Sequence, residues 1–184
     1  NKELAPYIKE ELESRGHKCD VIICPEGVFP SKESEYSYKI PKANSGGYNL
    51  VCELHLNASD GAGHGVEVFH YPGDKKGNNI ASHICKNISG FANRGPLTGQ
   101  LYMINDTRPT AVLVESFFCD NRQDSNLASQ VGFKKMSMAI ACGLLQEDYN
   151  SKANTNISDT NMKVGWVEES EQWYYYDKGK KRTG

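Results

Sequence analysis

Residues 111–114, Ala-Val-Leu-Val, most constrain the fold, because they form a short, uninterrupted apolar run between polar segments. A strand that is apolar on both faces is typical of a sheet covered by helices, whereas a half-exposed strand alternates apolar and polar residues. Amphipathic helical patterns lie before and after this run along the chain. The sequence therefore predicts an α/β domain built on a central sheet.

The other elements follow from the period of the apolar residues. Leu4, Ile8 and Leu12 recur every four residues, which predicts a helix over 2–15 that ends at Gly16. The same reasoning predicts helices over 77–91, 123–130 and 132–147, and a short helix inside the polar segment 25–47. Strands are predicted over 19–24, 48–56, 65–71, 101–104 and 111–114.

Length, charge and cysteine spacing bound the function classes. A chain of 184 residues that is 38% hydrophobic can form one medium domain with a small appendage. Its 21 basic and 23 acidic side chains give a net charge of -2, so we expect no nucleic-acid partner. No apolar run reaches the roughly eighteen residues of a membrane span, and no secretory signal is visible. The six cysteines are spread singly, so we expect reduced thiols and no cysteine zinc cluster.

The composition changes after Tyr149. Residues 149–162 are mostly Asn, Ser, Thr, Asp and Lys, which is typical of a linker. Residues 163–184 contain two aromatic runs around a polar turn, which predicts a β-hairpin. We therefore predict a main domain over 1–148, a linker over 149–162 and a small C-terminal unit over 163–184.

Two polar residues stand directly at the ends of predicted buried strands. His55 follows the run 50–54, and Glu115 follows the run 111–114. In an open α/β sheet, ligands bind beyond the carboxyl ends of the strands, so both side chains are placed for chemistry. A carboxyl group beside an apolar strand is also a candidate for a perturbed pKa and an acid–base role. On the residues alone, a hydrogen-bonded core histidine and a strand-end glutamate held by a backbone donor or an arginine remain alternatives.

Several motifs occur in the order and spacing of a known enzyme family. They are 54–59 (Leu-His-Leu-Asn-Ala-Ser), the glycine-rich loop after it, 65–69 (Gly-Val-Glu-Val-Phe), 91–95 (Phe-Ala-Asn-Arg-Gly) and 108–121, which contains Glu115. With these motifs the chain resembles the zinc-dependent N-acetylmuramoyl-L-alanine amidases of type 3, most of all those of clostridial phage endolysins. The resemblance covers roughly residues 1–148. It implies a mixed central sheet flanked by helices, the phosphorylase/hydrolase-like fold of these amidases.

The resemblance also implies a reaction and a metal. The reaction is cleavage of the amide between the lactyl group of N-acetylmuramic acid and L-alanine in peptidoglycan. The metal is one zinc ion bound by two histidines and a glutamate, with a further glutamate beside its water. By this resemblance His55 matches the last zinc ligand and Glu115 the catalytic glutamate. In the family the other two ligands come before the helix that starts here at Asn1, so we expect them upstream of Asn1.

Further polar residues are expected around the site. The candidates for orienting His55, positioning loops or binding substrate are Glu53, Asn57, Glu67, Arg94 and Asn121. The Arg94 guanidinium suits a carboxylate of the stem peptide, and a solvated or structural arginine is the alternative. His64 and His70 are alternative ligands near the crevice, less favoured because a zinc site needs fixed geometry.

The C-terminal unit resembles one repeat of the choline-binding or glucan-binding type. Its aromatic residues include Trp166, Trp173 and Tyr175. Such repeats stack, and aromatic side chains of neighbouring repeats hold quaternary ammonium groups. The resemblance implies a wall polymer, such as choline-substituted teichoic acid or a glucan, as a second partner beside peptidoglycan. Alternatively, these aromatic residues only cover one another across the hairpin.

Two other functions remain open on the sequence. One is a non-catalytic wall-binding protein that retains the amidase fold, and the other is a zinc carboxypeptidase or peptidase on a related scaffold. We expect action at the bacterial cell wall. A phage enzyme would wait in the host cytoplasm for holin-type release, whereas a bacterial autolysin would be exported.

Overall fold

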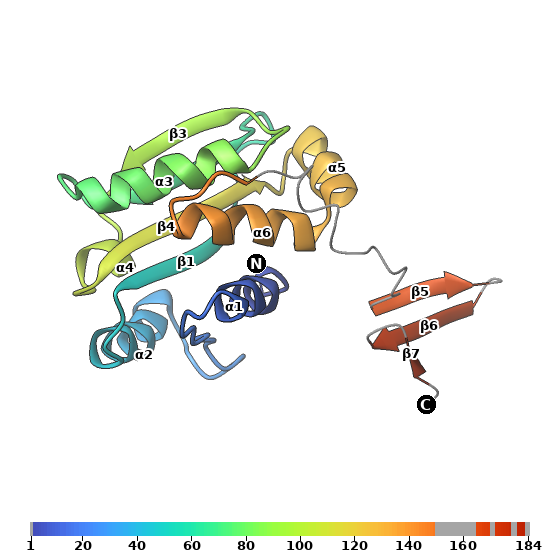
Figure 1. Cartoon of the computed structure of the whole chain (residues 1–184), viewed down its shortest axis with the longest axis horizontal. Coiled ribbons are helices and arrows are strands. Elements are labelled where there is room, and N and C mark those ends of the chain that lie inside the picture. The colour runs from blue at the N-terminus through green and yellow to red at the C-terminus, as the bar shows by residue number, and fades with distance from the viewer. Residues whose placement is uncertain (1, 150–164, 170–171, 178–179, 183–184) are drawn as a thin grey trace. The chain divides into compact units, whose positions relative to one another are not determined.

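The computed structural model describes residues 2–149, 165–169, 172–177 and 180–182 (Figure 1). The chain divides into two compact units, Asn1–Tyr149 and Asn150–Gly184. The first unit contains a four-stranded sheet in the order β1-β4-β2-β3. Its strands are β1 (Leu50–Asn57), β2 (Val66–His70), β3 (Asn93–Thr98) and β4 (Thr110–Phe118). The predicted α/β fold with a mixed sheet flanked by helices is confirmed.

Strand β4 lies between β1 and β2 and sets the register of both. It pairs in parallel with β1 and antiparallel with β2, while β3 extends the sheet in parallel to β2. Hydrogen bonds on both edges and apolar side chains on both faces bury most of β4. The apolar run 111–114 thus occupies the most enclosed strand of the sheet, as its composition predicts.

One face of the sheet carries the main hydrophobic core. Three helices cover this face, with α3 and α6 side by side (Figure 1): α1 (Leu4–Ser14), α3 (Lys75–Asn87) and α6 (Phe133–Leu144). Side chains alternate along a strand, so every second residue of β2 and β4 points to these helices. The resulting core contains Val66, Val68, Val112 and Val114 from the strands and Ile80, Ile84 and Ile140 from the helices.

The other face has a thinner cover. Helix α4 (Tyr102–Asn105) packs against β4, and α2 (Lys32–Ser45) packs against α4. Ile104 of α4 and Leu113 of β4 belong to a second, smaller hydrophobic cluster. Because this cover stops short of the carboxyl ends of β1 and β4, polar residues there line a cleft.

The predicted strand over 19–24 is wrong. This segment forms no strand, and Val21 and Ile23 are 40% and 52% exposed. A strand needs a partner for its backbone N–H and C=O groups, and within the described residues β1 pairs only with β4. A cavity of about 890 Å³ is lined by residues 17–27 and by β1 residues such as Val51. Apolar composition alone therefore does not bring 19–24 into the sheet.

The predicted strand over 101–104 is also wrong. Here the chain forms helix α4, which buries Met103 and Ile104. Strand β3 lies just before it and is not predicted, because Gly95 and Pro96 weaken its strand pattern. Proline lacks the N–H that a central strand donates, and β3 tolerates Pro96 because it lies at the edge of the sheet.

Helix α2 is longer than the short helix predicted within 25–47. It spans 14 residues and starts with a capping box in which Ser31 and Ser34 exchange side-chain and backbone hydrogen bonds. Pro41 lies inside this helix and hides its extent in the sequence. The remaining helix of the first unit is α5 (Arg122–Val131). The predictions for α1, α3, α5, α6, β1 and β2 are confirmed within a few residues.

The second unit contains three antiparallel strands. They are β5 (Gly165–Glu169), β6 (Gln172–Asp177) and β7 (Lys180–Arg182). The register places Trp166 opposite Tyr175 and Trp173 opposite Glu168. The predicted linker lies outside the described residues from 150 onwards. In the described part of the chain, no helix is both long and apolar enough to cross a membrane.

Candidate active site

Three polar residues from three neighbouring strands form a row across the sheet. His55 of β1 lies opposite Glu115 of β4, and Glu67 of β2 lies opposite Glu115 on its other side. Directly opposed residues project from the same face of a sheet, so the three side chains lie on one side. We call His55, Glu115 and Glu67 the polar row.

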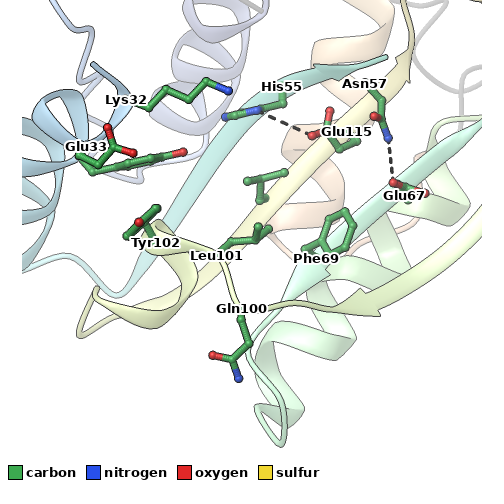
Figure 2. Close-up of a pocket in the computed structure, with 12 residues that line it drawn as sticks. Lys32, Glu33, His55, Asn57, Glu67, Phe69, Gln100, Leu101, Tyr102 and Glu115 are labelled. Atoms are coloured by element: carbon green, nitrogen blue, oxygen red, sulfur yellow. Dashed lines mark hydrogen bonds and ion pairs between the residues drawn. The ribbon is translucent and has the colours of Figure 1, made fainter. Parts of the chain in front are cut away.

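The polar row lines a cleft of about 390 Å³ (Figure 2). Along the strands, the next residues on the same face are Leu113 and Phe69, which give the cleft an apolar floor. The rim comes from outside the sheet and consists of Lys32, Glu33, Tyr36, Gln100, Leu101 and Tyr102. Strand order and side-chain alternation thus place the sheet residues of the cleft, and the segments 32–36 and 100–102 add its rim.

His55 is held by carboxyl groups on both sides of its ring. Its Nε2 lies 3.3 Å from Glu53 Oε1, and its Nδ1 lies 3.8 Å from Glu115 Oε1. The hydrogen bond to Glu53 and the nearby negative charges outweigh burial and raise the pKa of His55. Glu53 also accepts a hydrogen bond of 2.7 Å from Lys39 Nζ. Burial alone would raise the pKa of Glu53, but His55 and Lys39 outweigh it and lower that pKa.

Glu115 has the environment of an acid–base group. Burial, together with the negative charges of Glu67 and Glu53, raises the pKa of Glu115 to about 7, against the opposing effect of His55. Its Oε2 is buried and has no hydrogen-bond partner in the described part of the chain. A carboxyl group with a pKa near neutrality can both accept and return a proton. Glu115 is therefore the residue of the polar row whose carboxyl group can change protonation state near neutral pH.

Glu67 lies at the other end of the row and is fully partnered. It is only 6% exposed, and its two oxygens accept hydrogen bonds from Asn57 Nδ2 (2.8 Å) and Arg94 Nε (2.5 Å). The Arg94 guanidinium also lies over the ring of Phe118, 5.2 Å from its centroid. The Arg94 side chain is 45% exposed, so it combines a fixed position with access to solvent. Asn57, Glu67 and Arg94 therefore form one connected group.

The glycine-rich loop after β1 is tied to the start of α5. Asn121 caps α5 with its side-chain oxygen and donates a hydrogen bond from Nδ2 to the Gly61 carbonyl (2.9 Å). Asp120 accepts from Gly61 N–H (3.0 Å), and the buried Asp124 accepts from Gly65 N–H (2.7 Å). Asn121 thus positions the loop through backbone groups. The sequence does not single out Asp120 or Asp124 for this role, because it depends on contacts between distant segments.

The other two candidate histidines lie apart from the polar row. His64 is exposed in the loop, with Nδ1 3.2 Å from the Ala62 carbonyl. His70 is buried at the end of β2, opposite Val112, and its Nδ1 lies 2.9 Å from the Tyr71 carbonyl. Neither lines the cleft. The structure therefore does not bring them to His55.

The sequence prediction misses the part of the site that comes from α2 and α4, which includes Tyr36, Lys39 and Tyr102. Lys39 lies under the Tyr36 ring, 4.6 Å from its centroid, and reaches Glu53. The helical spacing of Tyr36 and Lys39 is a signal that a prediction of the full length of α2 would have used. No such signal predicts that Tyr102 lies beside Tyr36, because this contact depends on how α2 and α4 pack.

The described residues do not form a metal site by themselves. Among them, no three His, Cys, Asp or Glu side chains gather into a group that could hold a metal ion. His55 and the buried, unpartnered oxygens of Glu53 and Glu115 are suitable donors, but on this part of the chain they do not complete a three-ligand zinc site. We therefore assign no catalytic step to a metal.

The fold and the cleft define the class of protein. It is an α/β protein with a polar cleft over the central strands of its mixed sheet. The chain belongs to the N-acetylmuramoyl-L-alanine amidase family, whose model matches residues 1–146. A comparison with curated proteins gave no match.

Solved structures agree with this family. The catalytic domain of the CD27L endolysin, which targets Clostridia difficile, is 48% identical to this chain with a TM-score of 0.77. The match covers 82% of this chain and 83% of that domain. Cwp6 from Clostridium difficile is 26% identical with a TM-score of 0.64, over 78% of this chain and 24% of its own. The CwlV catalytic domain from Bacillus (Paenibacillus) polymyxa, 20% identical over 78% of this chain and 79% of its own, shares the fold with a TM-score of 0.65.

Proposed function

We propose that the cleft over β1, β4 and β2 hydrolyses the amide between the lactyl group of N-acetylmuramic acid and L-alanine. The family match and the similar amidase structures support peptidoglycan as the substrate. The observation that carries the proposal is the position of Glu115 beside His55 in the lining of the cleft, with one buried carboxyl oxygen that has no partner among the described residues. The place of action is the bacterial cell wall.

Glu115 performs the proton transfers in this proposal. A water molecule attacks the amide carbonyl carbon while the Glu115 carboxylate takes its proton. The C–N bond then breaks, and Glu115 returns the proton to the leaving L-alanine nitrogen. His55 lies within 3.8 Å of Glu115, and Glu53 and Lys39 hold the ring in place. The products are a free lactyl carboxylate on the sugar and a new L-alanine amino terminus on the peptide.

Product analysis tests this reaction. Purified walls treated with the protein should gain L-alanine amino termini in step with the fall in turbidity. A peptidase would instead release terminal amino acids or create other amino termini. A non-catalytic wall-binding protein would sediment with the walls and produce no new termini at any metal concentration, and that outcome would contradict the proposal.

Zinc dependence is a separate proposal, with His55 as the ligand that the described residues contribute. The His55 imidazole is exposed enough, at 36% of its side chain, to meet an ion at the cleft. After both proteins are supplied with zinc, we expect His55→Ala to carry less of the ion than the wild-type protein. The matched control is His64→Ala, which removes a histidine that does not line the cleft. Equal zinc content in all three proteins would exclude His55 as a ligand.

The C-terminal unit is proposed to bind a wall polymer such as choline-substituted teichoic acid or a glucan. Support comes from the antiparallel pairing of β5 and β6, two strands that carry Trp166, Trp173 and Tyr175. Walls with and without choline should then sediment different amounts of the full chain. A Trp166→Ala, Trp173→Ala variant should lose this difference while it still releases L-alanine termini. Equal sedimentation of both proteins with both walls would refute the proposal.

A further inference from the structure

The two ends of the catalytic cleft differ in chemistry. Figure 2 shows His55 and Glu115 between Asn57 and Glu67 on one side and Tyr102 on the other. The first end is polar and is connected to the Arg94 guanidinium. The second end lies on α2 and α4, where two tyrosine rings stand beside Lys32 and Glu33. A substrate that crosses the polar row therefore meets Asn57 and Glu67, held by Arg94 behind them, at one end and a pair of aromatic rings at the other.

Tyr36 and Tyr102 form the aromatic end. Their ring centroids lie 4.7 Å apart, and the ring planes are inclined by 31°. Tyr102 is 52% exposed, although its neighbours Met103 and Ile104 in the short helix α4 are buried. The buried neighbours hold α4 against the sheet, so the exposed Tyr102 side chain projects from a fixed helix. We call Tyr36 and Tyr102 the aromatic platform.

The aromatic platform is physically connected to the polar row. Lys39 lies 4.6 Å from the centroid of the Tyr36 ring and donates a hydrogen bond of 2.7 Å to Glu53. Glu53 in turn lies 3.3 Å from His55 Nε2. Through these contacts the rings keep a set position relative to the reacting groups. Such an arrangement is suited to holding one part of a substrate while another part reacts.

We propose that the aromatic platform binds a sugar ring of the glycan strand, so that the stem peptide runs toward Asn57, Glu67 and Arg94. This inference rests on the proposed amidase function. The C–H face of a sugar ring stacks on an aromatic ring, and tyrosine adds a hydroxyl group for the sugar's polar groups. The glycan has no free carboxylate while its lactyl groups are in amide linkage, whereas the stem peptide ends in one. The guanidinium end therefore suits the peptide and the aromatic end suits the glycan.

The rates of cleavage of two substrates test whether the aromatic platform binds a sugar ring. One is a soluble glycan strand that carries stem peptides, and the other is an N-acetylmuramoyl-peptide without flanking sugars. Loss of one stacking ring in Tyr102→Ala should lower the ratio of kcat/KM for the strand to that for the single sugar by about tenfold. Tyr102→Phe should keep the ratio, because it retains the ring. Tyr71→Ala is the matched control, since Tyr71 is 48% exposed but does not line the cleft. An unchanged ratio in Tyr102→Ala overturns the proposal.

A binding measurement tests, independently of catalysis, whether the aromatic platform binds glycan. Glycan strands stripped of peptide are titrated into the wild-type and variant full chains by calorimetry. Tyr102→Ala should bind these strands about tenfold more weakly than the wild type or Tyr71→Ala. Equal affinities, or a loss of affinity for sugar-free stem peptide instead, overturn the proposal. If the wild type cleaved neither substrate but this difference persisted, only the proposed amidase function would fail.

Discussion

Strands β1 and β4 have similar apolar sequences but different surroundings. β4 is paired on both edges, and all its residues except Thr110 and Glu115 are buried. β1 pairs only with β4 within the described residues, and each of its eight residues is half-buried. An apolar run thus predicts a strand, whereas neighbours decide how deeply that strand is buried. The polar row joins the two strands at one position, with Glu115 on the enclosed strand and His55 on the more open one.

Thiol reactivity should show the largest contrast, between Cys52 inside β1 and Cys119 just beyond the end of β4. Burial raises the pKa of Cys52 on β1 to about 12, whereas Cys119, one residue after β4, is exposed. The thiolate is the reactive form, so at pH 8 we expect Cys52 to react on the order of a thousandfold more slowly than an ordinary thiol. Its rate should rise about tenfold per pH unit below its pKa.

Labelling with a chromogenic disulfide, followed by mass mapping of the modified peptides, measures these rates. Cys119→Ser should remove a fast phase and leave the slow phase of Cys52 in place. Rapid modification of Cys52 at pH 8 in the folded protein would show that β1 is more open than the structure has it.

Core substitutions should give a smaller but clear contrast in stability. Val114 of β4 is fully buried in the main core, whereas Val51 of β1 is half-buried at the smaller cluster. Val114→Ala should lower the free energy of unfolding by about 2 kcal/mol, and Val51→Ala by about half as much or less. Urea denaturation followed by circular dichroism measures both. Equal losses would mean that β1 is as enclosed as β4 in solution.

The smallest expected effect concerns the far end of the polar row. Glu67→Gln keeps the shape of the side chain and an acceptor for Asn57, but it removes the charge that pairs with Arg94. Loss of such a supporting contact should lower kcat/KM on glycan-strand substrate by about tenfold. A Glu26→Gln variant serves as control, because Glu26 is exposed and lies outside this cleft. Activity equal to the wild type would show that β2 contributes no more than a wall of the cleft.

The candidate site shows what the sequence can and cannot predict. His55 and Glu115 are predictable because each follows an apolar strand, and such strand ends meet at one edge of an α/β sheet. Their alignment with Glu67 is not predictable from the sequence, because it depends on the antiparallel register of β2 against β4. Tyr102 is missed for a stronger reason: the segment 101–104 has the composition of a strand, and packing against β4 makes it a helix.

The fold, like the site, can be predicted from the sequence only in part. Helices α1, α3 and α6 are predictable because each has an apolar stripe that faces the sheet. Residues 19–24 are as apolar as β1, but a strand forms only where a partner can pair with it. Local composition therefore predicts which segments can form strands, and tertiary contacts select among them.

The most direct test of the account is Glu115→Gln in the full chain, with the release of L-alanine amino termini from purified walls as the readout. The variant keeps the size of the side chain and removes its ability to transfer the proton. We predict unchanged thermal unfolding and wall sedimentation, with a loss of activity of about 10²- to 10⁴-fold. Activity within about threefold of the wild type, well below the usual contribution of a general acid–base group, would contradict the central claim that Glu115 carries the chemistry.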